Sequence, residues 1–280
     1  MYIGAHISAA GDVSLAPQRA KDIGCECFQF FSRPPQGGKA KEITPEIAKN
    51  FKVNMKEYGQ FECYIHSPYY INLASLNNRI YHGSISVIRQ ELERGSLLGV
   101  KYMMIHLGSY REAGEKKGIA MAVEGLKKVL DDYTGETKLL VEMSAGAGSI
   151  IGDTYEEIDA VINSAKLKKY NIGICFDTAH GFASGYDLSS EKAVKKTFSE
   201  FNKKLGFKNL KLIHANDSKV ELNTKKDRHE HIGKGFIGVA GFQAIVDFAK
   251  AKKINLILET PADDSRIEDV KILKKMRDKK

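Results

Sequence analysis

Residues 171–177 read NIGICFD, a short apolar run that ends on a single acidic residue, Asp177. Runs of this length and composition are typical of strands that are buried in a parallel sheet. Seven further runs rich in Ile, Leu, Val, Phe and Tyr repeat the pattern, at 2–6, 25–31, 62–66, 101–106, 138–142, 210–217 and 254–259. The sequence therefore predicts eight strands, distributed over the whole chain.

The longer segments between these runs are predicted to be helices, because their apolar residues recur every three to four positions. Such segments lie at 44–59, 77–99, 153–166 and 189–206. The first opens with Thr44 as a candidate N-cap, followed by Pro45. No linker rich in Pro, Gly or Ser divides the chain, so we predict one domain over residues 1–280, a single (β/α)8 TIM barrel. A doubly wound open sheet is the alternative, but such a sheet does not need eight regularly spaced strands and so does not explain this number.

Composition limits the classes of function. The chain has 43 Lys and Arg residues against 35 Asp and Glu residues, a net charge of +8, which favours a polyanionic partner but also fits an ordinary basic enzyme. No apolar stretch approaches the ~18 residues of a membrane span, and no signal peptide is visible at the start. We therefore expect a cytoplasmic monomer with no membrane association. The cysteines form no CxxC pair and are expected to be reduced packing residues: Cys25, Cys27, Cys63 and Cys175.

Six of the predicted strands end on a side chain that can bind a metal ion. The carboxyl ends of all strands in a barrel converge on one face, so residues far apart in the sequence are expected to meet there. A single histidine at a strand end is more often structural, but six coincidences favour a site, since burying so many ionisable groups is costly without cations. The six residues are His66, His106, Glu142, Asp177, His214 and Glu259.

Two loops add three further candidate ligands. His180 follows Asp177 by three positions, and the segment KKDRHEHIGKG (225–235) contains Asp227 and His229. Five histidines and four carboxylates suit Zn²⁺, with Mn²⁺ or Fe²⁺ as alternatives, and argue against Mg²⁺ or Ca²⁺ alone. Four carboxylates carry a charge of −4, and three divalent cations carry +6. The surplus of +2 can hold a hydroxide and a phosphodiester anion. We therefore expect three metal ions per chain.

Aromatic and polar side chains beside these strands are candidates for contact with a polyanionic partner such as a nucleic acid. Tyr69 and Tyr70 lie three and four positions after the end of the third predicted strand and can wedge into a base stack, although packing on the barrel rim is the alternative. The loop at 30–41 follows the second predicted strand, and its Arg33 and Gln36 suit contacts to a nucleic acid. These residues extend the predicted site from metal binding to substrate recognition.

At these positions the chain resembles the endonuclease IV family of apurinic/apyrimidinic endonucleases. The resemblance covers the whole chain in order, and the combination of motifs is specific even though each alone is weak. The matching stretches are YIGAHISAAG (2–11), HSPYYINLA (66–74), MMIHLGS (103–109), VEMSAGAG (141–148), FDTAHGFASGYD (176–187), IHANDSK (213–219), DRHEHIGKG (227–235) and LILETP (256–261).

The resemblance implies a zinc-dependent barrel that cuts duplex DNA 5′ to abasic sites and leaves a 3′-hydroxyl and a 5′-deoxyribose phosphate. It also implies three ligand sets: His66, His106 and Glu142; Glu142, Asp177, His214 and Glu259; and His180, Asp227 and His229. Glu142, shared by two zinc ions, is the expected catalytic residue. Tyr69 becomes the preferred wedge, and Arg228 is expected to face a DNA phosphate. His6 and His231 have no role in the family pattern.

Two other functions remain as alternatives. A sugar isomerase or epimerase on the same type of barrel would need a single metal, held by Glu142, Asp177, His214 and Glu259 alone. The five additional candidate ligands and the basic charge speak against it. A non-catalytic binder of damaged DNA would have no use for a complete ligand set. Counting the metal ions per chain separates the isomerase from the nuclease.

Overall fold

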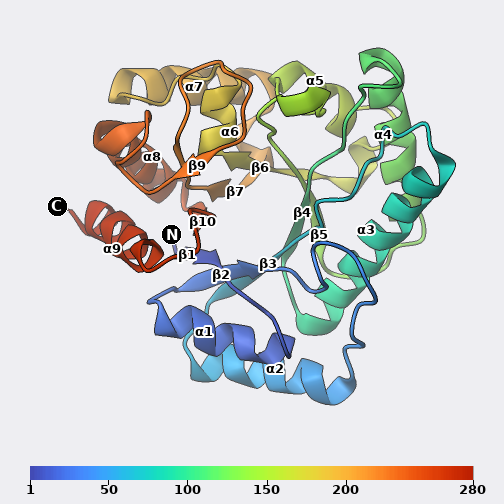
Figure 1. Ribbon diagram of the computed structural model, residues 1–280, viewed down its shortest axis with the longest axis horizontal. Helices are drawn as coiled ribbons and strands as arrows, with labels where there is room; N and C mark the ends of the chain where they lie inside the picture. Colours follow the sequence, from blue (N-terminus) through green and yellow to red (C-terminus); the bar gives the residue numbers. More distant parts are fainter. Residues whose placement is uncertain (280) are drawn as a thin grey trace.

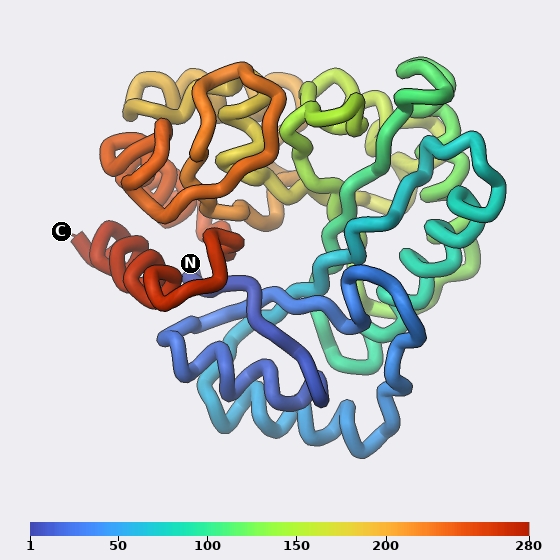
Figure 2. The backbone as a smooth tube through the Cα atoms, in the orientation of Figure 1, coloured from blue at the N-terminus to red at the C-terminus, as the bar shows by residue number. Residues whose placement is uncertain are grey.

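Eight parallel strands close into a barrel in the computed structural model, which describes residues 1–279 (Figure 1). Each strand pairs with its neighbours in the sequence, and the first strand also pairs with the last, so the first and last strands lie side by side (Figure 2). The strands are β1 (Ile3–His6), β2 (Cys27–Phe30), β3 (Glu62–His66), β4 (Tyr102–Ile105), β5 (Lys138–Glu142), β6 (Gly173–Asp177), β7 (Leu210–His214) and β10 (Asn255–Leu258). The predicted TIM barrel is confirmed, and the open sheet is excluded.

Helices surround the barrel and connect successive strands (Figure 1). They are α1 (Ala16–Asp22), α2 (Pro45–Glu57), α3 (Asn78–Leu98), α4 (Glu115–Leu130), α5 (Tyr155–Ile162), α6 (Thr178–Ala183), α7 (Glu191–Lys204), α8 (Gly238–Lys252) and α9 (Ser265–Asp278). The Thr44 side chain accepts a hydrogen bond from the backbone N–H of Ile47, which confirms the predicted N-cap of α2. Helix α3 is followed by the cap residue Gly99, whose φ of 76° is left-handed and therefore favours glycine.

The inside of the barrel contains an apolar layer of seven fully buried side chains, one from each strand except β1. Successive side chains on a strand point to opposite faces, so the residue two positions further on also points into the barrel, nearer its carboxyl end. In each of the seven cases that next residue is polar. The apolar layer thus forms the floor beneath a polar layer, and it consists of Cys27, Tyr64, Met104, Leu140, Cys175, Leu212 and Ile257.

The structure corrects one predicted strand and agrees with the expected state of the cysteines. The run at 210–217 is not one strand: β7 ends at His214, and β8 (Asp217–Ser218) pairs antiparallel with β9 (His229–Glu230). This small ribbon holds the loop that contains Asp227 against the barrel. The four cysteines are buried and free, as predicted for packing residues.

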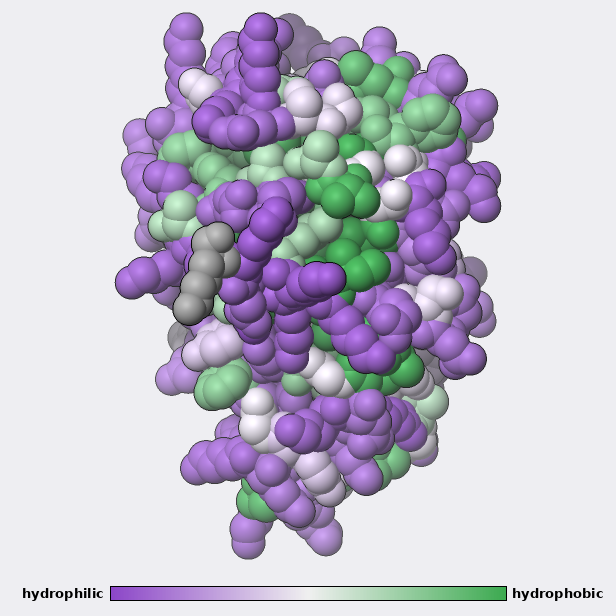
Figure 3. All heavy atoms as spheres, turned by 90° about the vertical axis from the view of Figure 1, so that its left-hand side faces the viewer, coloured by the Kyte–Doolittle hydropathy of each residue, from purple (hydrophilic) through white to green (hydrophobic). Residues whose placement is uncertain are grey.

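The side of the molecule that carries α8 and α9 exposes mainly hydrophilic side chains, with apolar ones visible between them (Figure 3). In the part of the chain that the structure describes, no helix is both long and apolar enough to cross a membrane. The monomeric state, the cytoplasmic location and the assignment of residues 1–280 to one domain stay predictions.

Candidate metal centre

A polar layer lies at the carboxyl end of the barrel, and every strand contributes one residue to it, either within its last two positions or directly after it. Seven of these residues follow a member of the apolar layer by two positions and share its inward orientation, and His6 pairs with one of the seven, Gln29. Glu142, Asp177 and His214 are completely buried, and His66 is 3% exposed. The layer consists of His6, Gln29, His66, His106, Glu142, Asp177, His214 and Glu259.

The first group of candidate ligands is His66, His106 and Glu142, whose ligand atoms lie within 4.8 Å of one another. Nε2 of His66 is 3.1 Å, and Nε2 of His106 is 3.6 Å, from Oε2 of Glu142. Nδ1 of His66 lies 2.6 Å from the carbonyl oxygen of Ser67, so it carries a proton and Nε2 is left to face the carboxylate. Among the described residues 1–279, the buried Nδ1 of His106 has no hydrogen-bond partner. A cation between these atoms would satisfy the facing lone pairs.

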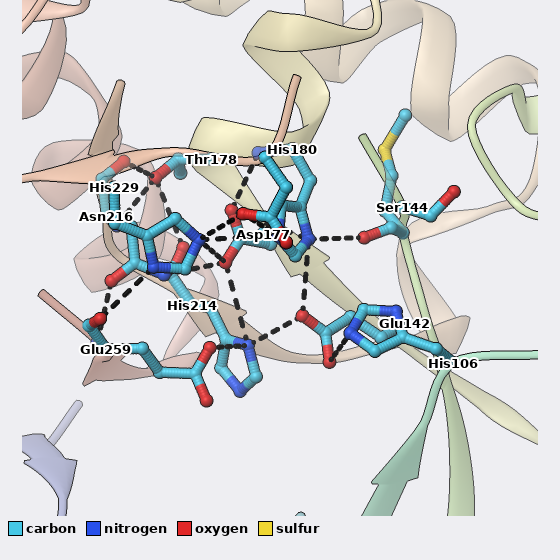
Figure 4. Close-up of polar contacts among 12 residues, drawn as sticks. His106, Glu142, Ser144, Asp177, Thr178, His180, His214, Asn216, His229 and Glu259 are labelled. Carbon is cyan, nitrogen blue, oxygen red and sulfur yellow. Dashed lines mark hydrogen bonds and ion pairs between the residues drawn. The ribbon is translucent and has the colours of Figure 1, made fainter. Parts of the chain in front are cut away.

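The second group surrounds His214 at the centre of the layer (Figure 4). Its Nδ1 lies 3.0 Å from Oε1 of Glu142, 3.1 Å from Oε2 of Glu259 and 3.8 Å from Oδ2 of Asp177. One N–H donor cannot satisfy three carboxylates, two of them fully buried, whereas a divalent cation can accept ligands from all of them. The geometry of this group therefore fits a metal ion.

The third group brings two imidazoles together at the mouth of the barrel. Nδ1 of His180 is 2.9 Å from the carbonyl oxygen of Met143, and Nδ1 of His229 is 3.1 Å from that of Glu259. Both Nδ1 atoms therefore act as donors, and the two Nε2 atoms face each other at 3.3 Å. Two facing lone pairs at this distance require a shared proton or cation.

Two acidic side chains lie near these imidazoles. The compact cluster contains Asp177 together with His180 and His229, whereas the family resemblance implies Asp227 as the acidic ligand. Oδ1 of Asp227 nevertheless lies 3.2 Å from Nε2 of His180 and 3.4 Å from Nε2 of His229, on a side chain that is 54% exposed. Asp177 thus lies between the second and third groups, and Asp227 closes the third group from the solvent side.

Electrostatics within the layer depend on compensation between acids and imidazoles. Burial alone would raise the pKa of Glu142, but the charges of His214 and His106 hold that pKa well below its usual value. Burial would lower the pKa of His214, but neighbouring anions, Glu259 and Glu142 among them, raise it well above its usual value. The buried carboxylates therefore stay ionised only with positive charge beside them. Bound divalent metal ions would supply that charge and displace the protons from imidazole.

Two buried amides support the candidate ligands, and the sequence analysis did not identify either. The Gln29 side chain contacts His214 and Glu259. Asn216 donates to Oδ2 of Asp177 at 2.6 Å and accepts from the backbone N–H of Glu259 at 2.7 Å. The sequence did contain a signal for Gln29, because this polar residue lies two positions after Cys27, whose side chain points into the barrel.

The two histidines without a role in the family pattern have different environments. His6 belongs to the polar layer, and its Nδ1 lies 2.9 Å from Nε2 of Gln29. His231 lies outside the layer and contacts Oδ2 of Asp269, on α9, at 2.7 Å. Thr260, directly after Glu259, donates to the same oxygen at 2.7 Å. Asp269 therefore ties two ligand-bearing loops to the last helix.

The candidate DNA contacts are not equally accessible. Tyr69 is 70% exposed and Tyr70 is 41% exposed. Gln36 and Arg228 also lie at the surface. Arg33 is only 8% exposed, which does not support its predicted role.

The reason for the difference at Arg33 lies in α3. Nε of Arg33 lies 2.6 Å from Oε1 of the fully buried Glu91, and a further guanidinium nitrogen donates to Gln90 at 3.0 Å. The positive charge of Arg33 is therefore already neutralised. It anchors the loop after β2 to α3.

A cleft of about 880 Å³ opens above the metal candidates. Its lining includes His66, His106, His180 and His229, together with residues of the loops after β1 and β2. The imidazoles are thus accessible to a ligand that enters the cleft.

Comparisons with known proteins agree with this geometry. A family model described as a xylose isomerase-like TIM barrel matches residues 17–277. The chain is 39% identical over 284 residues to a probable endonuclease 4 from Nitrosopumilus maritimus, with 99% of each chain covered. The endonuclease IV structure from Thermus thermophilus superimposes with a TM-score of 0.85 at 25% identity, covering 99% of this chain and 98% of the other. A D-tagatose 3-epimerase-like protein shares the fold alone, with a TM-score of 0.74 at 18% identity, covering 99% of this chain and 97% of the other.

Proposed function

Because the chain belongs to the endonuclease IV family and is thus a nuclease that hydrolyses phosphodiester bonds, we propose that it incises duplex DNA 5′ to abasic sites. The proposed products are a 3′-hydroxyl and a 5′-deoxyribose phosphate. One observation carries the proposal: three groups of candidate ligands meet at one end of the barrel, and Glu142 and Asp177 each belong to two of them. This arrangement suits several cations acting on one phosphate.

We infer that three zinc ions bind per chain. The first is held by His66, His106 and Glu142, the second by Glu142, Asp177, His214 and Glu259, and the third by His180, Asp227 and His229. The mixture of imidazoles and carboxylates supports zinc. When bound, such ions supply a water molecule that is deprotonated near neutral pH and positive charge for the phosphate.

The side chains divide the remaining tasks. The Oε2 atom of Glu142 faces His66 and His106, while its Oε1 atom faces His214, so this carboxylate joins two of the groups. Its burial excludes water from the junction. We propose that Glu142 acts as the catalytic residue by fixing the separation of the two sites it shares.

Recognition of the lesion is assigned to the rim of the cleft. The ring of Tyr69 lies 6.1 Å from that of His66 and packs against Phe31, so it projects beside the metal candidates while staying 70% exposed. We propose that Tyr69 and Tyr70 enter the base stack at the abasic site. Gln36 and Arg228 are proposed phosphate contacts, and the net charge of +8 favours DNA in general.

The test is an incision assay combined with metal analysis. An end-labelled duplex with one abasic site should be cut 5′ to that site, and an identical duplex without the lesion should stay intact. A chelator should abolish incision, added zinc should restore it, and elemental analysis should give three metal ions per chain. The proposal is wrong if the protein holds a single metal ion and leaves the abasic duplex uncut, a result that would favour the sugar isomerase or epimerase.

A further inference from the structure

Strands β1 and β2 contribute to the polar layer, yet neither ends on a proposed metal ligand. Their contributions are His6 and Gln29, which pair across the two strands. Gln29 is completely buried. A neutral amide at this depth needs hydrogen-bond partners for its oxygen and for both of its N–H groups.

Every polar group of Gln29 has a partner within the layer. Its Oε1 lies 2.7 Å from Nε2 of His214. Its Nε2 lies 2.5 Å from Oε1 of Glu259 and 2.9 Å from Nδ1 of His6. The opposite orientation of the amide would place its oxygen against the Glu259 carboxylate, so this network fixes the orientation.

The network also decides which nitrogen of His214 carries the proton. The Gln29 oxygen can only accept, so Nε2 of His214 must donate to it. Nδ1 faces the carboxylates of Glu142 and Glu259 on the opposite side of the ring, and it is therefore the nitrogen whose lone pair becomes available when a metal ion displaces its proton (Figure 4). This is the tautomer that a metal ion at the second group requires.

Local structure explains how Gln29 reaches both partners. A Cβ atom on Gly4 would collide with the carbonyl oxygen of Cys27, so only glycine allows β1 to approach β2 this closely. Gly4 and Cys27 are paired two positions before His6 and Gln29. The close approach therefore places His6 beside Gln29, whose second N–H remains for Glu259.

We propose that Gln29 is a positioning residue, which fixes the tautomer of His214 and the orientation of Glu259 and thereby sets the metal affinity of the second group. The inference rests on the proposed function, because it assumes that this group binds a metal ion. Side chains that orient metal ligands in this way typically change metal affinity by about 10–100-fold when they are replaced.

The experiment replaces Gln29 by leucine, which has a similar volume and no polar atoms. The matched control is Gln60→Leu, because Gln60 is also a buried glutamine, 6% exposed, and donates to the carbonyl oxygens of Cys25 and Tyr58 away from the polar layer. Competition with a chromophoric chelator measures zinc affinity site by site. Gln29→Leu should weaken one of the three sites by about 10–100-fold. Gln60→Leu should leave all three unchanged.

A second measurement distinguishes positioning from a general loss of structure. Long-range ¹H–¹⁵N spectra of the histidine rings should show a proton on Nε2 of His214 in the zinc-loaded protein. That signal should broaden or disappear in Gln29→Leu and persist in Gln60→Leu. A Gln29→Met variant, which keeps the length of the side chain, should give the same result if leucine lowers the melting temperature of the metal-free protein.

The outcomes separate this inference from the function on which it depends. If the unaltered protein binds no stoichiometric metal, the proposed function fails. If the unaltered protein binds three zinc ions and Gln29→Leu binds them with equal affinity and the same His214 tautomer, only the role of Gln29 is refuted.

Discussion

The apolar and the polar layers of the barrel lie on the same strands, only two residues apart, yet they differ in what they contribute. Leu140 and Leu212 fill the interior and need no partner, whereas Glu142 and His214 directly above them are buried charges that need compensation. The barrel geometry directs both layers inward. Stability is therefore expected to depend mainly on the first layer and activity on the second.

The largest effect is expected for Glu142→Gln. The amide keeps the size of the side chain but removes the charge that faces His66 on one side and His214 on the other. We expect single-turnover incision to fall at least about 10³-fold, which corresponds to about 4 kcal/mol of lost transition-state stabilisation. Binding of abasic DNA should change far less. Incision close to that of the unaltered protein would mean that Glu142 does not join two metal sites.

The matching change in the apolar layer is Leu140→Ala. The leucine is fully buried two positions before Glu142, so its loss leaves a cavity below the metal candidates. We expect the free energy of unfolding to fall by about 2–5 kcal/mol, measured by chemical denaturation. Incision per folded molecule should stay within a few-fold of the unaltered protein. A loss of activity as large as that of Glu142→Gln would contradict the division of tasks between the layers.

The two ends of the barrel also differ in their exposed aromatic residues. Tyr69 lies at the carboxyl end and is 70% exposed, while Phe61 lies before β3 at the amino end, is 61% exposed and stacks on Tyr2. We expect Tyr69→Ala to weaken binding of an abasic duplex by about 1–3 kcal/mol, the usual contribution of an aromatic side chain stacked on a base. Phe61→Ala is the control and should bind DNA normally. Equal effects in a titration of labelled duplex would argue against Tyr69 as the wedge.

Much of this arrangement was predictable from sequence because it follows from periodicity. Short apolar runs that end on His, Asp or Glu predicted both the barrel and the convergence of six candidate ligands at one end, and two loops supplied the other three. Gln29 was missed because an uncharged residue inside the run 25–31 has no obvious chemistry until its neighbours from β7 and β10 are known.

Other differences arise from contacts between segments that are distant in the sequence. Arg33 was expected at the DNA surface, but it pairs with Glu91 on α3, 58 residues away. The position of Asp177 in the third group depends on how the loop that contains His229 folds back over β6. Neither contact can be inferred from the spacing of residues along the sequence.

The smallest effect concerns a buried carboxylate outside the polar layer, Glu157 in the first turn of α5. Burial raises the pKa of Glu157 to about 7, and Asp153 adds to the shift, whereas imidazoles lower the pKa of Glu142. The folded protein thus binds this proton more tightly than the unfolded chain, whose glutamate has a pKa of about 4.3. The stability that Glu157 contributes is present below pH ~4.3 and is lost as the pH rises through about 7.

Glu157→Gln should remove this dependence of stability on pH, because the amide stays neutral at every pH. The amide oxygen can still accept the hydrogen bond that the backbone N–H of Gly152 donates to the carboxylate at 2.7 Å in the unaltered protein. At pH 4 the variant should have the same melting temperature as the unaltered protein, and at pH 8 its melting temperature should be a few degrees higher. A change of about 1 kcal/mol in the free energy of unfolding corresponds to about 2–4 °C. Melting curves at both pH values, compared within each pH, isolate the contribution of this residue. A higher melting temperature for the unaltered protein at pH 8 would show that the charge of Glu157 is compensated as that of Glu142 is, and the contrast between these two buried carboxylates would then be lost.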